Sequence, residues 1–445
     1  FFQGGPVRQV TMTNHFQSIA KTPLLIAMDA EWGPGMRLDS TLSYPRQMSL
    51  GAIRNDELIY QMGYQIGNQL KRLGVHINFA PVADINNNPM NPVINCRSFG
   101  EDRVNVAFKA YNYARGLEDA GIIATLKHFP GHGDTESDSH YTLPVLHHST
   151  DRIDSLELFP FRYCISNAIP AVMTAHLHIP SLDSTAGLPS SLSPSIVTGV
   201  LKKKLGFEGL IITDALNMKG ATNSFKPGEL EVKAFLAGND ILLMPPDVEK
   251  ALNYIKREVK KGRISEEEIE ARCRKILLAK AWAGVTKPEI IDTGFLIEEL
   301  NSPFYRSFKR ELIRNSLTVI KNENATLPVI NTNRASIASV SVGSDKNDVF
   351  NETLKLYTDV ATFSMSKNTD YADFELLKLK LADYNTIIIS IQGTSNRGSA
   401  NYGITEQTIR FIHSLNPDGK IILCIFGNPF SLQLFNDLQN IDAIM

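Results

Sequence analysis

Six short apolar segments alternate with helical patterns in the first two thirds of the chain, and this alternation restricts the fold more than any other feature. Several of the segments are near-continuous apolar runs, as expected for parallel strands that are covered on both faces. Between them, apolar residues recur at helical spacing, as in Leu58, Met62, Ile66 and Leu70. Such strand–helix units predict a (β/α) barrel or a doubly wound sheet. The expected strands are Leu24–Asp29, Ile77–Asp84, Ala124–Gly131, Ala171–Leu177, Leu210–Leu216 and Asp240–Pro245.

Polar side chains stand at the carboxyl ends of five of these strands. They are Asp29, Asp84, Lys127 with its neighbour His128, His176 and Asp214. A doubly wound sheet concentrates its ligands at one switch point. A barrel instead brings every strand end to one mouth. Five polar strand ends therefore favour the barrel.

The number of expected strands bears on how much of the barrel this sequence contains. A standard barrel has eight strands, two more than the six found here. We therefore expect a (β/α)8 TIM-type barrel whose first strands, before Gly4, are missing from the sequence. The barrel should span residues 1–290, followed by a linker and connecting helix at 291–315. Residues 316–445 should form a smaller α/β sandwich domain that is truncated at its end.

Local signals place further elements. Asn105–Ala120 reads as a helix that Gly121 stops, and Ser265 with Glu268 forms a capping box ahead of a helix carrying Ile269, Cys273 and Ile276 on one face. Residues 441–445 read as the start of another strand. Strands are expected in the second domain at Leu317–Ile320, Ile337–Val342, Thr386–Ile391 and Lys420–Phe426.

Composition excludes several classes of protein. Of the 445 residues, 45 are Lys or Arg and 47 are Asp or Glu, so the net charge of −2 offers no basic surface for nucleic acid or an anionic membrane. No apolar run approaches the roughly 18 residues of a membrane span. The four cysteines, Cys96, Cys164, Cys273 and Cys424, have no metal-type spacing, and we expect four buried thiols.

The segment from Lys127 to His140 directly follows an expected strand and concentrates reactive side chains. It holds three histidines, three acidic residues and one lysine, and its proline and glycines predict a loop. A plain solvated loop would not need a lysine and a histidine at the strand end. A metal site is another alternative, with His132, Asp134, Asp138 and His140 as possible ligands, although their spacing matches no standard arrangement.

A second segment, Leu210–Met218, is a hydrophobic strand that ends in one carboxylate, Asp214. At the mouth of a barrel such a carboxylate is a candidate nucleophile or base. An aspartate is also a good N-cap for a following helix. This segment alone leaves the two interpretations open.

Together these segments resemble glycoside hydrolase family 3, and within it the bacterial β-N-acetylglucosaminidase branch. The run Lys127–Gly133 with Asp138–His140 is similar to the signature of that branch, and Thr213–Met218 is similar to its nucleophile strand. The resemblance covers the chain from about Gly4 to Trp282 and, more weakly, the domain that follows. Further similar segments are Leu24–Asp29, Asn78 with Ala80–Val82, Arg97–Gly100 and Ala175–His176.

The resemblance implies a role for individual residues. Asp214 matches the catalytic nucleophile, His140 the general acid/base and Asp138 the carboxylate that accompanies this histidine. Where many relatives have Glu-Gly-Gly-Arg after the first strand, this chain has Glu31–Arg37, so the match at Arg37 departs from the pattern. No metal and no organic cofactor is implied. The residues expected to hold the sugar are Asp29, Arg37, Arg97, Lys127, His128 and His176.

These residue types suit hydrolysis with retention of configuration. The reaction needs a nucleophile on one face of the sugar and a proton donor roughly 5 Å away. A carboxylate with a pKa near 4 is ionised at neutral pH, whereas a histidine with a pKa near 6.5 can donate and accept a proton there. Asp138 can fix the tautomer of His140. Pro130, Gly131 and Gly133 suggest that the histidine sits on a mobile arm that closes over substrate.

We therefore expect a retaining exo-β-N-acetylglucosaminidase that acts on peptidoglycan-derived muropeptides, a substrate that rests on the resemblance alone. Alternatives are a family 3 β-glucosidase or β-xylosidase, whose acid/base is usually a carboxylate in or near the second domain, and a degenerate carbohydrate-binding protein. Phosphorolysis is a possible side activity. We expect a monomer, and a periplasmic or exported location is favoured over a cytoplasmic one.

Overall fold

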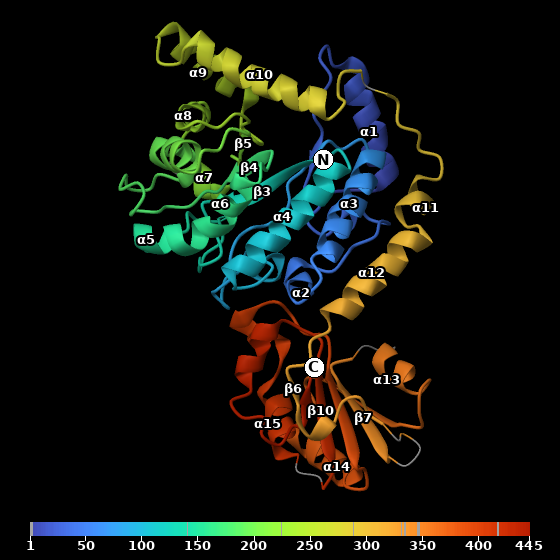
Figure 1. The fold of residues 1–445 in the computed structure, drawn as a ribbon. Coiled ribbons are helices and arrows are strands. Elements are labelled where there is room, and N and C mark those ends of the chain that lie inside the picture. Colours follow the sequence, from blue (N-terminus) through green and yellow to red (C-terminus); the bar gives the residue numbers. More distant parts are fainter. Residues whose placement is uncertain are drawn as a thin grey trace. The chain divides into compact units, whose positions relative to one another are not determined.

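The computed structural model describes residues 3–139, 141–223, 225–287, 289–330, 332, 335–344, 348–415 and 418–445. The chain divides into two units, of which the first ends at Ser316 and the second begins at Leu317 (Figure 1). Residues 291–315 fall into the first unit, where Leu296, Leu300 and Leu312 join its hydrophobic core. The two units are described separately.

The first unit contains one parallel sheet whose strands are neighbours in the order of the chain, β1-β2-β3-β4-β5. Helices follow the strands, as in a (β/α) barrel. Ile241 forms one more parallel bridge, to Ile212, at the far edge. The prediction of strands before Gly4 stays a prediction. The strands are β1 (Ala27–Met28), β2 (Ile77–Asn78), β3 (Ile123–Phe129), β4 (Ala171–Thr174) and β5 (Leu210–Thr213).

Five expected strands are confirmed in place, but most are shorter than the apolar runs suggested. The first strand shows why. The side-chain oxygen of Asn78 accepts from the N–H of Ala30 at 2.9 Å. Beyond β1, a side chain therefore provides the hydrogen bond that a neighbouring strand's backbone would otherwise make. The sixth segment, Asp240–Pro245, pairs with β5 through the parallel bridge at Ile241 and a few backbone hydrogen bonds, and is not assigned as a strand.

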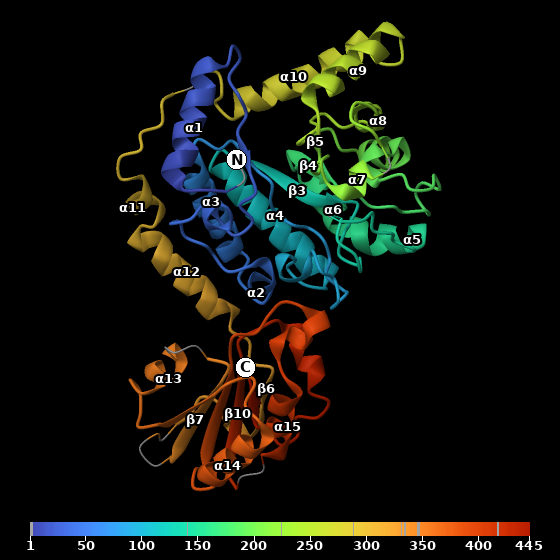
Figure 2. The same cartoon turned by 180° about the vertical axis from the view of Figure 1, so that it is seen from behind.

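The helices of the first unit surround these strands (Figures 1 and 2). Two expected helices are confirmed, and Gly121, with φ of +86°, follows directly on the end of the second one. Two π-helical segments, Ile153–Glu157 and Ser195–Lys204, are also present. The α-helices are α1 (Pro6–Ile19), α2 (Gln47–Gly51), α3 (Glu57–Arg72), α4 (Arg103–Asp119), α5 (Thr150–Arg152), α6 (Leu158–Ser166), α7 (Lys219–Thr222), α8 (Glu229–Ala237), α9 (Val248–Lys260), α10 (Glu266–Trp282), α11 (Leu296–Leu300) and α12 (Pro303–Ser316).

Helix α10 begins as predicted, because the Ser265 hydroxyl accepts from the N–H of Glu268 at 3.1 Å. The expectation of four buried thiols is wrong at Cys273, which is exposed, whereas the other three cysteines are buried. The reason is the orientation of the helix. It turns Ile276 and Ala279 toward the sheet, and Cys273 lies on the side that faces solvent.

The second unit is a mixed sheet in the order β6-β11-β10-β9-β7-β8, parallel except for β6 against β11. Four predicted strands are confirmed, and they include the strand start expected at residues 441–445, where β11 lies. The prediction at Leu317–Ile320 is wrong because its apolar side chains are largely exposed, and the partly exposed edge strand β8 was missed. The elements are β6 (Lys321–Asn322), β7 (Ile337–Val342), α13 (Val349–Leu354), β8 (Ala361–Met365), α14 (Tyr371–Leu381), β9 (Thr386–Ile391), α15 (Glu406–Ser414), β10 (Lys420–Ile425) and β11 (Ala443–Ile444).

The described helices include none long and apolar enough to cross a bilayer.

Helices α3 and α4 pack so closely that glycine is needed at their contact. A Cβ placed on Gly116 would lie 2.1 Å from the carbonyl oxygen of Tyr60, whereas one on Gly199 would meet nothing closer than 3.8 Å. We expect Gly116→Ala to lower the free energy of unfolding by about 1–3 kcal/mol. The control Gly199→Ala should be neutral or slightly stabilising. Urea unfolding of both variants checks this, and equal stability would contradict the packing argument.

Candidate active site

The carboxyl ends of the five strands bring the predicted polar residues to one edge of the sheet. Asp29 follows β1, Lys127 and His128 lie near the end of β3, and Asp214 follows β5 directly. The pairing of Thr174 with Thr213 fixes the register at this edge, and the N–H of Asp214 donates to the carbonyl of Thr174 at 2.8 Å. The strand ends therefore meet as a barrel mouth requires.

A buried ion-pair cluster occupies the mouth near β1 and β3. The ammonium of Lys127 lies 2.8 Å from Asp29 and 2.8 Å from Glu31. Arg97 donates to both oxygens of Glu31, at 2.7 and 3.0 Å, and Arg37 donates to Asp29 at 2.6 Å. Burying a charge is costly unless it is paired, and here each charge has at least one opposite partner.

Electrostatics keeps these groups ionised. Burial alone would raise the pKa of Asp29 and Glu31, but the neighbouring cations outweigh it and hold both pKa values below the usual range. Burial alone would lower the pKa of Lys127, and the two carboxylates instead raise it. The cluster therefore stays charged at neutral pH.

His128 is held by a buried carboxylate, Asp84. The ring Nδ1 lies 2.7 Å from Asp84, whose other oxygen accepts from the N–H of His132 at 2.7 Å. The other ring nitrogen of His128 lies 3.3 Å from Arg97. The contact between Nδ1 and Asp84 orients the ring, so that Nε2 faces the guanidinium of Arg97. Burial tends to raise the pKa of Asp84, and His128 more than offsets this.

Asp214 differs from the other carboxylates at this edge. It is half-buried, and its Oδ1 accepts from the N–H of Ala215 at 2.8 Å. Burial tends to raise its pKa, but His128, His176 and Lys127 lower it below 3.8. The N-cap interpretation is wrong, because α7 begins at Lys219 with Met218 at its cap position. Among the described residues, none is found bonded to Oδ2 of Asp214.

His176 is fully buried, and both ring nitrogens face protein groups. Nδ1 lies 2.7 Å from the Ser191 hydroxyl, and Nε2 lies 3.2 Å from the carbonyl of Ala215. The ring thus supports the segment that follows Asp214. Direct contact of His176 with a sugar stays a prediction.

The loop after β3 is anchored along its first half. Pro130–Gly133 are buried, and a Cβ on Gly133 would lie 1.7 Å from the carbonyl oxygen of Ile85. Both ring nitrogens of His132 are engaged, by Thr135 at 2.7 Å and Ser139 at 3.2 Å, and burial lowers its pKa to about 4. The glycines therefore serve close packing, and any movable part of this loop lies beyond Thr135.

The loop's proposed catalytic residues lie in that second part. Asp138 is half-buried, and its carbonyl accepts from the N–H groups of Tyr141 and Thr142. The predicted acid/base, His140, lies outside the described residues. Its role and the pairing with Asp138 stay predictions.

Sequence reasoning missed two carboxylates that organise the mouth. Glu31 lies two residues beyond Asp29, and Asp84 was noted only as a polar strand end. Both are fully or almost fully buried. One signal in the sequence could have identified them. Each is an acidic residue at or just after the end of an apolar strand, and arginine and lysine lie near neighbouring strand ends.

Of the four metal ligands weighed from the sequence, His140 lies outside the described residues, and the other three do not form a group close enough to hold one ion. His132 is occupied by its two hydroxyl partners, and Asp134 instead lies against His148 at 2.8 Å. Among the described residues, the group close enough to hold one ion is Asp134, His148 and Glu157.

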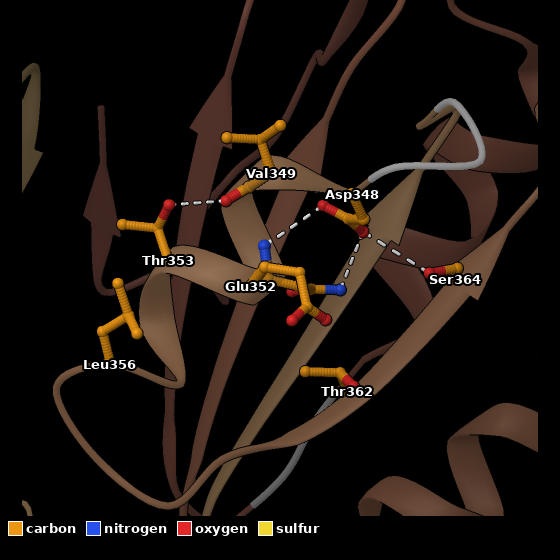
Figure 3. Close-up of a pocket in the computed structure, with 8 residues that line it drawn as sticks. Asp348, Val349, Glu352, Thr353, Leu356, Thr362 and Ser364 are labelled. Atoms are coloured by element: carbon orange, nitrogen blue, oxygen red, sulfur yellow. Dashed lines mark hydrogen bonds between the residues drawn. The ribbon is translucent and has the colours of Figure 1, made fainter.

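A hollow of about 660 Å³ in the second unit also contains acidic residues (Figure 3). Its Asp348 caps α13 by accepting from the N–H of Asn351 at 3.1 Å, and Glu352 pairs with Lys355 at 2.8 Å. These contacts give both carboxylates a structural role, so the candidate active site is the barrel mouth.

Comparison with known proteins agrees with this site. The family model described as "Glycosyl hydrolase family 3 N terminal domain" matches residues 5–279. Beta-hexosaminidase A of Pseudoalteromonas piscicida is 33% identical over 71% of this chain, which spans 57% of that protein. A beta-hexosaminidase of Nitrosospira multiformis is 35% identical over 54% of this chain and 70% of its own.

Among solved structures, a family 3 beta-N-acetylglucosaminidase from Paenibacillus superposes with a TM-score of 0.79 and 30% identity, covering 100% of this chain and 86% of its own. A beta-glucoside phosphorylase superposes with a TM-score of 0.82 at 21% identity, over 100% of this chain and 82% of its own, and shows the fold alone. These matches confirm the TIM-type barrel followed by a sandwich domain. The chain belongs to glycosyl hydrolase family 3.

Proposed function

We propose that this chain is a retaining exo-β-N-acetylglucosaminidase with Asp214 as its nucleophile. The observation that carries the proposal is a contrast between carboxylates at the barrel mouth. Both oxygens of Asp29, Glu31 and Asp84 bind cations, an imidazole or N–H groups. Asp214 is ionised and half-buried, and one of its oxygens is bonded to no described residue. It is therefore the carboxylate best able to attack a sugar.

The ion-pair cluster supplies a pre-organised pocket for the sugar hydroxyls. Asp29 and Arg97 keep 24% and 20% of their side chains exposed, while Lys127 beneath them is 2% exposed. A hydroxyl can donate to the carboxylate and accept from the guanidinium at the same time. Groups already held by each other lose little freedom when substrate binds. We place the nonreducing-end sugar against Asp29, Arg37, Arg97, Lys127, His128 and His176.

The proposed reaction has two steps. First, Oδ2 of Asp214 forms a bond to the anomeric carbon as the glycosidic C–O bond breaks, and His140 transfers its proton to the leaving oxygen. The neutral His140 then takes a proton from water, whose oxygen displaces Asp214 and releases the sugar. Asp138 would stabilise the cationic form of His140. Because retention needs the donor and nucleophile roughly 5 Å apart, the mechanism requires that His140 lie about this far from Asp214 in the substrate complex.

The names of the relatives support an N-acetylhexosamine substrate, since several are beta-hexosaminidases. One from Cellulomonas fimi, 27% identical over 70% of this chain, is named as a beta-N-acetylglucosaminidase/beta-glucosidase, which makes glucosides the second candidate. Muropeptides from peptidoglycan remain our proposed natural substrate.

A panel of 4-nitrophenyl β-glycosides that differ only at C2 tests the substrate class. We expect the 2-acetamido sugar to be turned over with a much higher kcat/KM than the glucoside. The same panel in phosphate and in a non-phosphate buffer, with sugar phosphate assayed, tests phosphorolysis. An equal or higher kcat/KM for the glucoside would reject the acetylglucosaminidase assignment.

Replacing the nucleophile should separate chemistry from folding. We expect Asp214→Asn to abolish turnover and to leave the melting temperature close to that of wild type, because only one described hydrogen bond of the side chain is affected. Asp119→Asn, at the exposed end of α4, serves as a matched control and should stay active. A 2-deoxy-2-fluoro glycoside should label the peptide that contains Asp214, and a label on another peptide would end the proposal.

The pH dependence should distinguish the nucleophile from the acid. Asp214 must be ionised, so its contribution is lost only as pH falls through its lowered pKa, below 3.8. A histidine acid must be protonated, so activity falls as pH rises through roughly 6.5.

His140→Ala should slow substrates with poor leaving groups by about 10²–10⁴-fold and remove the alkaline limb of the pH profile. Activated aryl substrates should be slowed far less, and equal slowing would contradict the acid role.

A further inference from the structure

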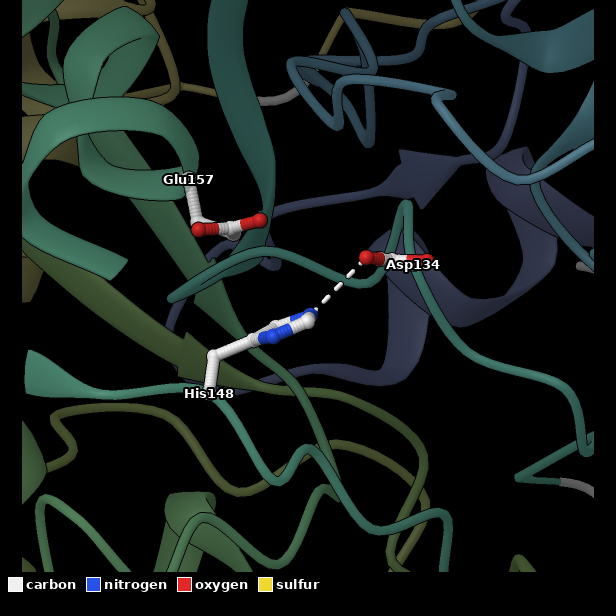
Figure 4. A group of neighbouring side chains, drawn as sticks. All are labelled: Asp134, His148 and Glu157. Carbon is white, nitrogen blue, oxygen red and sulfur yellow. Dashed lines mark hydrogen bonds and ion pairs between the residues drawn. The ribbon is translucent and has the colours of Figure 1, made fainter. Parts of the chain in front are cut away.

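Three side chains that the proposed reaction does not use converge beside the loop after β3. They are Asp134 on that loop, His148 ahead of α5, and Glu157 at the end of the π-helical segment before α6. One ligand atom from each lies within 4.8 Å of the others. Figure 4 shows the imidazole and the two carboxylates pointing toward one another, with the His148–Asp134 contact dashed.

Glu157 shows that this cluster lacks a partner. The residue is only 5% exposed, and its Oε1 accepts from Arg152 at 2.5 Å, but no described atom bonds to the buried Oε2. Leaving a buried carboxylate oxygen unsatisfied costs free energy, and a positive ligand would remove that cost. Burial also raises the pKa of Glu157, as expected for a carboxylate with too little compensation.

We propose that Asp134, His148 and Glu157 bind one divalent transition-metal ion of the zinc class. One imidazole nitrogen and two carboxylate oxygens are a donor set that Zn²⁺ accepts, whereas Ca²⁺ and Mg²⁺ prefer oxygen atoms alone. Three protein ligands leave one position of a tetrahedral ion for water.

Binding requires a small contraction of the cluster. Ligand atoms about 2.1 Å from a tetrahedral ion lie roughly 3.4 Å apart, so any longer separation in the cluster, whose ligand atoms lie within 4.8 Å of one another, must shorten. Asp134 and His148 keep 23% and 30% of their side chains exposed and can turn toward Glu157. The Nε2 of His148 must present its lone pair to the ion. Any proton it carries toward Asp134 is released to solvent on binding.

Arg152 is the natural competitor for this site. Its guanidinium bonds Oε1 of Glu157 and also lies 3.7 Å from Asp134. Arg152 bonds Oε1 of Glu157, and Oε2 remains for the ion. The guanidinium and the ion can therefore contact the same carboxylate. Because the two positive charges repel each other, Arg152 should weaken metal binding, and removing its charge should strengthen it.

The position of the site gives the ion a structural consequence. Asp134 lies four residues before Asp138 on the same loop, while His148 and Glu157 come from the next segment of the chain. A bound ion would tie the two segments together where the buried half of the loop ends. Ligands that bind only the folded state stabilise it, so the melting temperature should rise with metal concentration.

The test is metal binding by the full chain after treatment with a chelator. We expect calorimetry to show one Zn²⁺ per chain, and Co²⁺ to give visible absorption bands of a coordinated ion that Zn²⁺ displaces. His148→Ala and Asp134→Asn should each weaken binding at least tenfold. His147→Ala, which changes the exposed neighbouring histidine, should bind like wild type. Arg152→Gln should bind more tightly than wild type.

Each outcome bears on the proposal. Absence of Co²⁺ bands in wild type, or unchanged affinity in both His148→Ala and Asp134→Asn, would overturn it. Loss of binding in His147→Ala would also do so, since surface histidines would then be the ligands. Melting curves without metal identify a variant that fails to fold, and the other ligand variant then decides. Neither result depends on glycosidase activity, so failure here leaves the proposed function standing.

Discussion

The buried ammonium of Lys127 is the interaction on which the barrel mouth depends. It lies between Asp29 and Glu31, and so connects the end of the third strand with the segment after the first. A lysine that is 2% exposed needs both carboxylates, and breaking such a pair typically costs about 3–5 kcal/mol. Arg37, from the same segment after β1, and Arg97, from the connection between β2 and α4, complete the set. The cluster can therefore form only when the strands stand in the correct register.

The partners of each carboxylate at this edge support the roles that we propose for them. Four acidic side chains lie close together at one edge, and their chemical class alone does not distinguish them. Asp29, Glu31 and Asp84 each use both oxygens to hold cations, an imidazole or N–H groups, and this makes them supports for other residues. Asp214 makes one described bond and is kept ionised by the positive field of the same neighbours. The environment, more than the residue type, selects the candidate nucleophile.

Much of this could be predicted from the sequence, because near-continuous apolar runs with polar ends are a local signal. The strand ends at Asp29, Lys127 and Asp214 are examples. The partners of these residues could not be predicted in the same way. Glu31 reaches Arg97, and Asp134 reaches His148, through loops whose paths no local pattern specifies. The exposure of individual helix residues was also hard to predict. Cys273 is exposed because of the way in which α10 packs on the sheet, and the sequence does not specify this packing.

The loop after β3 links the two candidate sites. Asp84 holds its start through the N–H of His132, and the His148–Asp134 contact holds it two residues further on. Two anchors so close together leave the backbone between them little freedom to move. The close contact between Gly133 and the backbone of Ile85 restricts this part of the loop further. We therefore expect any movement of this loop to begin beyond Thr135, which is itself buried and bonded to His132. A metal ion at the second anchor would strengthen the attachment of the loop just before this point.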